Sequence, residues 1–314
     1  MAEVKKVATR DGYGMALVEL GKINQDFLVL DADLGAATRT GMFKKEFPDR
    51  FYNCGIAEQN MISLAAGIAS TGKKVFASTF AMFAAGRAFE QIRNSVGYPR
   101  LNVKIGATHA GVSVGEDGAT HQCCEDIALM RTIPGMIVIN PADVVEAKAC
   151  VIKAFEVDGP VYMRFGRLAV PVIFDEDYEF QIGKGIELRP GTDVTIIATG
   201  LMVAEALQAH EILAAEGVSA RIINMATIKP IDKEIIIKAA KETGLIITAE
   251  EHSIIGGLGS AVCEVTSEKY PVKVIRIGIK DTYGISGPAV DLLKYYNLTA
   301  EEIAKTALQA VKCK

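Results

Sequence analysis

Residues 27–31 read FLVLD and residues 136–140 read MIVIN. Both runs are apolar at consecutive positions, which is typical of parallel strands that are buried on both faces. Similar runs recur along the first half of the chain, and stretches with helical periodicity separate them. We expect strands at 27–30, 75–77, 103–106, 136–139 and 161–164, and helices at 11–23, 58–70, 84–96 and 143–155. This alternation predicts an α/β domain with a doubly wound sheet that helices cover on both faces.

The alternation is interrupted between residues 173 and 192, where the chain is acidic and rich in turn-forming residues. A second alternation follows, with Asp232 and Thr299 at positions where helix N-caps are expected. Its strands are expected at 194–198, 220–224, 245–249 and 272–277, and its helices at 202–216 and 232–243, after 259, and from 289 and 300. The sequence therefore predicts two domains, 1–180 and 190–314, of which the second is a smaller α/β domain.

Composition excludes several classes of protein. The 314 residues carry a net charge of −4, so there is no basic field that would attract nucleic acid. The first residues, MAEVKK, lack the apolar stretch of a secretion signal, and no apolar run reaches the ~18–20 residues of a membrane span. The six cysteines form no CxxC pair, which argues against a zinc site or a disulfide framework. We expect a cytoplasmic protein that binds neither nucleic acid nor membranes.

The segment THAGVSVGEDGATHQ, residues 108–122, contains two of the four histidines, two acids and three glycines. It follows the end of an expected strand, where open α/β sheets place their ligands. One interpretation is a glycine-rich surface loop. A second is a metal site made by His109, Asp117 and His121, although their spacing matches no known metal loop. We favour a third, in which the loop offers two imidazoles and a carboxylate to a polar substrate.

Other residues allow both a structural and a functional interpretation. Glu58 stands between a strand-like stretch and an apolar helix, where a first-turn glutamate favoured by the helix dipole is common. Phe80 and Phe83 are three residues apart, so they could fill the core or support a flat cofactor ring. Arg10 and Arg164 could be surface charges, or they could bind phosphate at the ends of strands.

Taken together, these segments resemble transketolase. Residues 108–122 look like that family's TH…GVGEDGPTHQ loop, GIAEQNM at 55–61 resembles its G-x-x-E-x-x-M helix start, and STFAMF at 78–83 is similar to its TF-x-x-F segment. Full-length members have a diphosphate-binding, a pyrimidine-binding and a C-terminal domain, and this chain resembles the last two. It has no GDG motif for the diphosphate and its metal. Because the chain starts with Met and ends in an amphipathic helix, we expect the C-terminal subunit of a split enzyme.

The resemblance implies that thiamine diphosphate is the cofactor and that a divalent cation, expected to be Mg²⁺, is bound by the partner subunit. Glu58 matches the catalytic glutamate that shares a proton with N1′ of the aminopyrimidine. Phe80 and Phe83 match aromatic residues that stack on that ring, whereas Gly86 stands where the family often has a third. His121 matches a catalytic histidine near the cofactor's amino group. We expect no metal ligands in this chain.

The same resemblance implies roles toward the substrate. His109 matches a histidine that contacts substrate hydroxyls, and Asp117 matches the acid that recognises the donor's C2 hydroxyl. Arg10 and Arg164 match the two arginines that bind the sugar phosphate. A serine that assists these arginines in the family is absent here, so that contact is either missing or moved to Thr38.

The implied activity is that of a transferase of the pentose phosphate pathway, which moves a two-carbon ketol unit from a ketose phosphate to an aldose phosphate. We expect activity only with the N-terminal subunit, in an α₂β₂ heterotetramer built on a dimer of this chain. Three alternatives remain: a 1-deoxyxylulose-5-phosphate synthase-like protein, the β subunit of a 2-oxo acid dehydrogenase, and a non-catalytic regulatory partner of the same fold. The presence of Glu58, His109 and His121 argues against the last.

Overall fold

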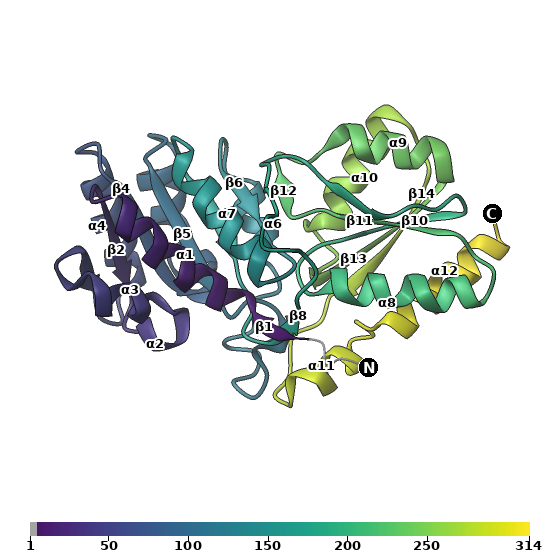
Figure 1. Cartoon of the computed structure of the whole chain (residues 1–314), viewed down its shortest axis with the longest axis horizontal. Helices are drawn as coiled ribbons and strands as arrows, with labels where there is room; N and C mark the ends of the chain where they lie inside the picture. The colour runs from purple at the N-terminus through teal and green to yellow at the C-terminus, as the bar shows by residue number, and fades with distance from the viewer. Residues whose placement is uncertain (1–4) are drawn as a thin grey trace.

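The computed structural model describes residues 5–314, and Figure 1 shows its two α/β units side by side. The first four residues of the predicted 1–180 domain lie outside the described residues. Seven strands form the sheet of the first unit, five form that of the second, and a two-stranded ribbon lies below the junction between them (Figure 1). The predicted fold class is confirmed, since both units alternate strands and helices.

The first sheet has the strand order β12-β6-β7-β5-β4-β2-β3, and all pairs except β12–β6 are parallel. Its strands are β2 (Phe27–Asp31), β3 (Phe51–Asn53), β4 (Lys74–Phe80), β5 (Val103–Thr108), β6 (Ile137–Ile139), β7 (Val161–Arg164) and β12 (Thr227–Lys229). The helices of this unit are α1 (Thr9–Ile23), α2 (Gly35–Thr38), α3 (Thr40–Glu46), α4 (Glu58–Ala69), α6 (Asp126–Arg131) and α7 (Val144–Glu156). Two short strands, β1 (Lys6–Ala8) and β8 (Ala169–Pro171), pair in the separate ribbon.

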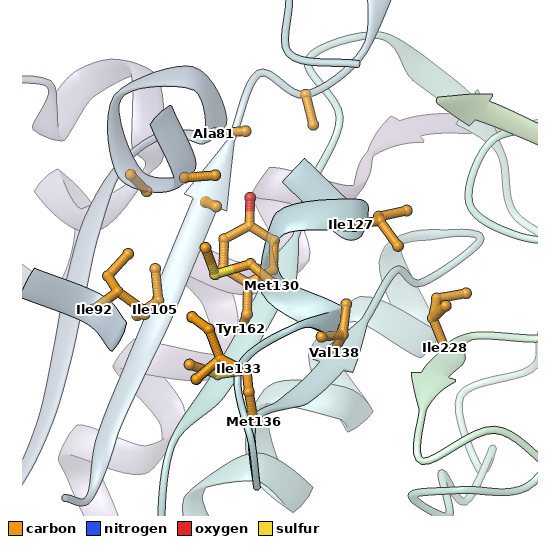
Figure 2. Close-up of a cluster of buried hydrophobic side chains, with 14 of the residues drawn as sticks. Ala81, Ile92, Ile105, Ile127, Met130, Ile133, Met136, Val138, Tyr162 and Ile228 are labelled. Atoms are coloured by element: carbon orange, nitrogen blue, oxygen red, sulfur yellow. The ribbon is translucent and has the colours of Figure 1, made fainter. Parts of the chain in front are cut away.

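The residues of FLVLD divide between two hydrophobic clusters, one on each face of the sheet. Phe27 and Val29 belong to the cluster that also contains residues of α1 and α7. Leu30 belongs to the cluster that contains Met61 of α4. Figure 2 shows part of this second cluster, in which the ring of Tyr162 lies among apolar side chains. The consecutive apolar positions therefore have the predicted cause, because both faces of the strand are covered.

The prediction of one continuous helix at 84–96 is wrong in the type of helical turn. The structure has π-helical turns at Met82–Arg87 (η2) and Ile92–Gly97 (η3), joined by a short α-helix, α5 (Phe89–Gln91). The backbone N–H of Ala88 donates to the carbonyl of Phe83, a bond that spans five residues instead of four. Hydrophobic periodicity does not distinguish α-helical from π-helical turns, and π turns occur frequently at functional sites.

The second sheet has the order β14-β13-β10-β11-β9, with β9 antiparallel at its edge. Its strands are β9 (Ile186–Arg189), β10 (Val194–Ala198), β11 (Ala220–Asn224), β13 (Leu245–Ser253) and β14 (Lys273–Ile279). Helices α8 (Met202–Ala215) and α12 (Ala300–Lys312) cover one face, and α9 (Lys233–Thr243) and α10 (Leu258–Lys269) cover the other (Figure 1). A short helix, α11 (Ala289–Tyr295), precedes α12. Both predicted N-caps are confirmed: the Asp232 side chain accepts from the N–H groups of Glu234 and Ile235, and Thr299 accepts from that of Glu302.

The two units are joined by strand pairing as well as by a linker. Residues 172–185 contain no helix or strand, yet β12 from the second half of the chain pairs with β6 and extends the first sheet. Strand β12 also brings Ile228 into the cluster shown in Figure 2. The C-terminal unit is therefore packed directly against the unit that contains the candidate site. Among residues 5–314, no helix is both long enough and apolar enough to cross a membrane.

Candidate active site

The sheet brings Phe80 and the start of the histidine-rich loop together. Strands β4 and β5 are parallel neighbours with Phe80 opposite Thr108, so both strands end at the same edge. The ring of His109, the next residue, stacks on Phe80 with 3.8 Å between ring centroids. The ring of Phe83 also stacks on Phe80, with 5.8 Å between centroids. Ligand sites of open α/β sheets lie at this edge, so Phe80, Phe83 and His109 share a location that suits a ligand.

His109 is held as a neutral imidazole. It is 4% exposed, and its Nε2 accepts a hydrogen bond from Nη1 of Arg10 at 3.0 Å. Its Nδ1 therefore carries the proton and donates to Oγ1 of Thr108 at 2.9 Å. Burial, followed by the positive charges of Arg10, Arg167 and Arg39, lowers the pKa of His109 to about 3. The imidazole can therefore accept a hydrogen bond near neutral pH without becoming charged.

The rest of the loop turns back toward the aromatic pair. His121 lies edge-on to Phe83 and Phe80, at centroid distances of 5.3 and 6.4 Å. Asp117 is exposed in a tight turn in which the N–H of Gly118 donates to the carbonyl of Gly115. The structure thus brings both histidines to the same aromatic surface and leaves the carboxylate of Asp117 accessible on the loop that carries them.

The C-terminal unit supports this loop through Glu251. Oε1 of Glu251 accepts from the backbone N–H of Ser113 at 2.6 Å. A Cβ on Gly111 would lie 2.3 Å from the carboxyl carbon of Glu251, so only glycine allows this approach. Gly111 also has φ 80°, in the left-handed region that favours glycine. Glu251 therefore determines the path of the loop between its two histidines.

Glu58 is the first residue of α4 and is 1% exposed. Its Oε2 accepts a hydrogen bond from Nη1 of Arg87 at 2.8 Å. The guanidinium carbon of Arg87 also lies 4.4 Å from the ring centroid of Phe83. A continuous set of contacts thus runs from Glu58 through the aromatic pair to His109 and Arg10. The sequence did not single out Arg87, because its position depends on the π-helical turn that it ends.

Arg164, which the sequence resemblance predicts to bind phosphate, lies apart from this group and is paired inside the protein. It is 3% exposed, and its Nε donates to both carboxylate oxygens of buried Asp126. Its Nη2 donates to the carbonyls of Cys123 and Glu251. A guanidinium with these partners is part of the structural core, because releasing it would leave Asp126 buried without a counter-charge.

Arg167, three residues further along, is the arginine that reaches the site. Its Nη1 donates to the carbonyl of Val114 in the histidine-rich loop and lies 3.4 Å from Oε2 of Glu116. Its side chain is 41% exposed, and its charge is among those that lower the pKa of His109. The sequence contained a signal for this: Arg164 belongs to a strand buried on both faces, whereas Arg167 lies beyond the strand end.

Thr38 does not replace the missing serine. It is fully buried, and its hydroxyl donates to Oδ2 of Asp31 at 2.7 Å. The neighbouring residue contributes through its backbone instead, since the carbonyl of Ala37 accepts from Nη1 of Arg10 at 3.1 Å. This segment therefore positions Arg10 and offers no hydroxyl at that point.

The residues present fit one half of thiamine diphosphate. A buried carboxyl beside a pair of stacked aromatic rings suits a flat aminopyrimidine, which needs a hydrogen-bonding partner at its edge and apolar contact on its face. For the diphosphate half, no group of three or more His, Cys, Asp or Glu side chains within residues 5–314 is arranged to hold a metal ion. The fit is confined to the pyrimidine ring.

Comparisons with known proteins agree with this division. Residues 5–172 match the transketolase pyrimidine-binding domain, and residues 183–303 match the transketolase C-terminal domain. A protein from Methanocaldococcus jannaschii named as a transketolase C-terminal section is 57% identical over 96% of each chain. One of the subunits of an apulose-4-phosphate transketolase, from Phocaeicola vulgatus, is 43% identical over 98% of each chain.

One solved structure extends the similarity to the fold. It is an inactive β4 tetramer of a split-gene transketolase, with a TM-score of 0.90 and 52% identity over 98% of this chain and 99% of that one. Both domains of the described chain are therefore matched in order and over nearly their whole length. The chain belongs to the transketolase family and corresponds to its pyrimidine-binding and C-terminal domains.

Proposed function

We propose that this chain is the C-terminal subunit of a split transketolase, which transfers a two-carbon ketol unit from a ketose phosphate to an aldose phosphate with thiamine diphosphate. The observation that carries this proposal is a continuous set of contacts at one edge of the sheet, which runs from Glu58 through Arg87, Phe83 and Phe80 to His109 and Arg10. It combines an acid–base group, an apolar stacking surface, a neutral imidazole and a cation for phosphate.

Glu58 acts on the edge of the aminopyrimidine. Its carboxyl is buried at the N-terminus of α4, where it can hold or release a proton at N1′ of the ring. Phe80 and Phe83 would hold the ring face, and His121, which lies edge-on to both of them, would contact the ring's amino group. When bound, thiamine diphosphate supplies the carbon nucleophile that adds to the donor carbonyl and carries the two-carbon unit.

The remaining residues of the site act on the substrate. His109 contacts substrate hydroxyls as a neutral group, and Asp117 recognises the donor's C2 hydroxyl from the loop. Arg10 and Arg167 bind the sugar phosphate, and Arg167 takes the role that the sequence resemblance gave to Arg164. Support for this change comes from the accessible guanidinium of Arg167 and its contact with the loop.

The diphosphate and its divalent cation, Mg²⁺, are bound by an N-terminal partner subunit. Two copies of this chain associate through their pyrimidine-binding domains, and two partner chains complete two sites in an α₂β₂ assembly. The split-gene relative, described as an inactive β4 tetramer, supports both self-association and a requirement for a partner. All six cysteines are free thiols, which is consistent with a cytoplasmic enzyme.

The test is reconstitution. The chain is co-expressed with a partner that carries the GDG…Asn motif, and the complex is assayed with xylulose 5-phosphate and ribose 5-phosphate, the sugars of the pentose phosphate pathway. Ketol transfer by the complex and none by either chain alone is the expected result. Because the Phocaeicola vulgatus relative is named for another sugar phosphate, apulose 4-phosphate belongs in the same panel. Inactivity toward every ketose phosphate tested would refute the proposal.

A further inference from the structure

The guanidinium of Arg87 makes the same two kinds of contact that the aminopyrimidine ring would need. Its Nη1 donates to Oε2 of Glu58 at 2.8 Å, and its planar head lies 4.4 Å from the centroid of Phe83. A guanidinium and an aminopyrimidine are both flat, and both carry N–H groups at their edge. Each can therefore stack on an aromatic face while its edge hydrogen-bonds to a carboxyl group.

The local backbone directs Arg87 to this place. It is the last residue of the π-helical turn η2, which begins at Met82, two residues after β4 ends. The wider turn contains one residue more than an α-helical turn, so the residue after Gly86 faces back toward α4. Nε2 of Gln59 donates to the carbonyl of Arg87 at 3.2 Å and fixes its backbone. The Arg87 side chain is 47% exposed, which allows the head group to swing into solvent while its backbone stays in place.

We propose that Arg87 is a latch that competes with the cofactor ring for Glu58 and Phe83, so that thiamine diphosphate binds only when the guanidinium is displaced. This inference rests on the proposed function, since it concerns the same carboxyl and the same ring. While closed, the latch keeps the buried carboxyl of Glu58 paired with an opposite charge. Cofactor binding then replaces the guanidinium by the ring, whose N1′ shares a proton with the carboxyl of Glu58, and the net affinity is reduced by the free energy of opening the latch.

The experiment measures cofactor affinity in the enzyme assembled with its partner subunit. Thiamine diphosphate is titrated with Mg²⁺ into the wild type, Arg87→Met and Arg87→Lys by calorimetry. Methionine fills similar space without the charge, so the dissociation constant should fall about fivefold to tenfold, the combined scale of an exposed ion pair and a cation–π contact. Lysine keeps the charge but not the planar head, and its constant should lie between those of the other two. Arg93→Met removes an exposed arginine from the neighbouring π turn and should leave the affinity unchanged.

A double-mutant cycle locates the competition at Glu58. In a Glu58→Gln background the ion pair is absent, so Arg87→Met should tighten binding by no more than about twofold. A wild-type measurement needs no variant: modification of arginines by phenylglyoxal, followed by mass spectrometry, should show faster reaction of Arg87 after the cofactor is added.

The outcomes distinguish a failure of the proposal about Arg87 from a failure of the proposed function. Unchanged or weaker binding by Arg87→Met, or protection of Arg87 by the cofactor, would overturn the latch and leave the proposed function standing. Failure of the wild-type complex to bind thiamine diphosphate at all would overturn both.

Discussion

Nη1 of Arg10 lies 3.0 Å from Nε2 of His109 and donates a hydrogen bond to it. This contact joins a residue at the start of α1 to the histidine-rich loop, and it determines which nitrogen of the imidazole carries the proton. The arginine expected to bind phosphate therefore also contributes, after burial, to keeping the neighbouring histidine neutral.

Replacing Arg10 by methionine should raise the pKa of His109. Burial is the largest cause of the lowered value of about 3, and the charge of Arg10 is the next. Without that charge the pKa should rise, yet stay below the ordinary value of about 6.5 because the ring remains buried. The chain has four histidines, so the Cε1–H signal of His109 can be assigned by mutation and followed by NMR during a pH titration. A pKa that falls or stays constant would contradict the effect assigned to the charge of Arg10.

Arg164 and Arg167 should give opposite results when each is changed to methionine. Arg164→Met leaves Asp126 buried without its partner and should cost about 3–5 kcal/mol in the free energy of unfolding. Arg167→Met should change that free energy by no more than about 1 kcal/mol, because the side chain is half exposed. It should instead raise KM for the sugar phosphate about tenfold to a hundredfold, the scale of a lost charge-assisted hydrogen bond. Urea denaturation and steady-state kinetics separate the two effects, and a reversal of the pattern would restore Arg164 to the site.

Much of the fold could be predicted from the local sequence pattern. Runs such as FLVLD are apolar at consecutive positions because both faces of the strand are buried, and this can be recognised without knowing its neighbours. The strand β12 could not be predicted, because its pairing with β6 is a contact between distant parts of the chain. The histidine-rich loop was recognisable as a candidate site from its composition. Arg87 was not recognisable as a candidate, because its position depends on a π-helical turn and hydrophobic periodicity does not distinguish such a turn from an α-helical one. The pairing of Arg164 with Asp126 could not be predicted either, because the two residues are 38 positions apart in the sequence.

Glu251→Gln should alter how stability depends on pH. Burial raises the pKa of Glu251 from 4.5 to about 7, so the folded chain retains a proton that the unfolded chain releases between these values. The stability that this proton contributes is complete below pH 4.5 and is lost as the pH rises through 7. Glutamine does not titrate, so the variant should gain about 3 kcal/mol relative to the wild type between pH 4.5 and pH 8. Urea midpoints at several pH values measure this difference, and a constant difference would show that Glu251 is ionised throughout.

Glu58→Gln should nearly abolish turnover of the assembled enzyme while the fold is kept. An amide preserves the shape of the side chain but cannot exchange a proton with the aminopyrimidine, so the rate should fall about a hundredfold or more. Exchange of the cofactor's C2 proton for deuterium, followed by NMR, tests the same step without substrate. Near-normal exchange in the variant would remove Glu58 from its proposed role. Asp117→Ala is the matched control, because it should leave this exchange intact and affect only the kinetics of the donor sugar.

The central claim is that this chain supplies the pyrimidine half of a cofactor site that a partner subunit completes. Calorimetric titration of thiamine diphosphate and Mg²⁺ tests it most directly, first into the chain alone and then into the chain assembled with its partner. We predict weak or undetectable binding by the chain alone and tight, Mg²⁺-dependent binding by the assembly, because the sequence lacks the GDG motif that the transketolase resemblance assigns to the diphosphate and its metal. Tight, Mg²⁺-dependent binding by the isolated chain would contradict the claim.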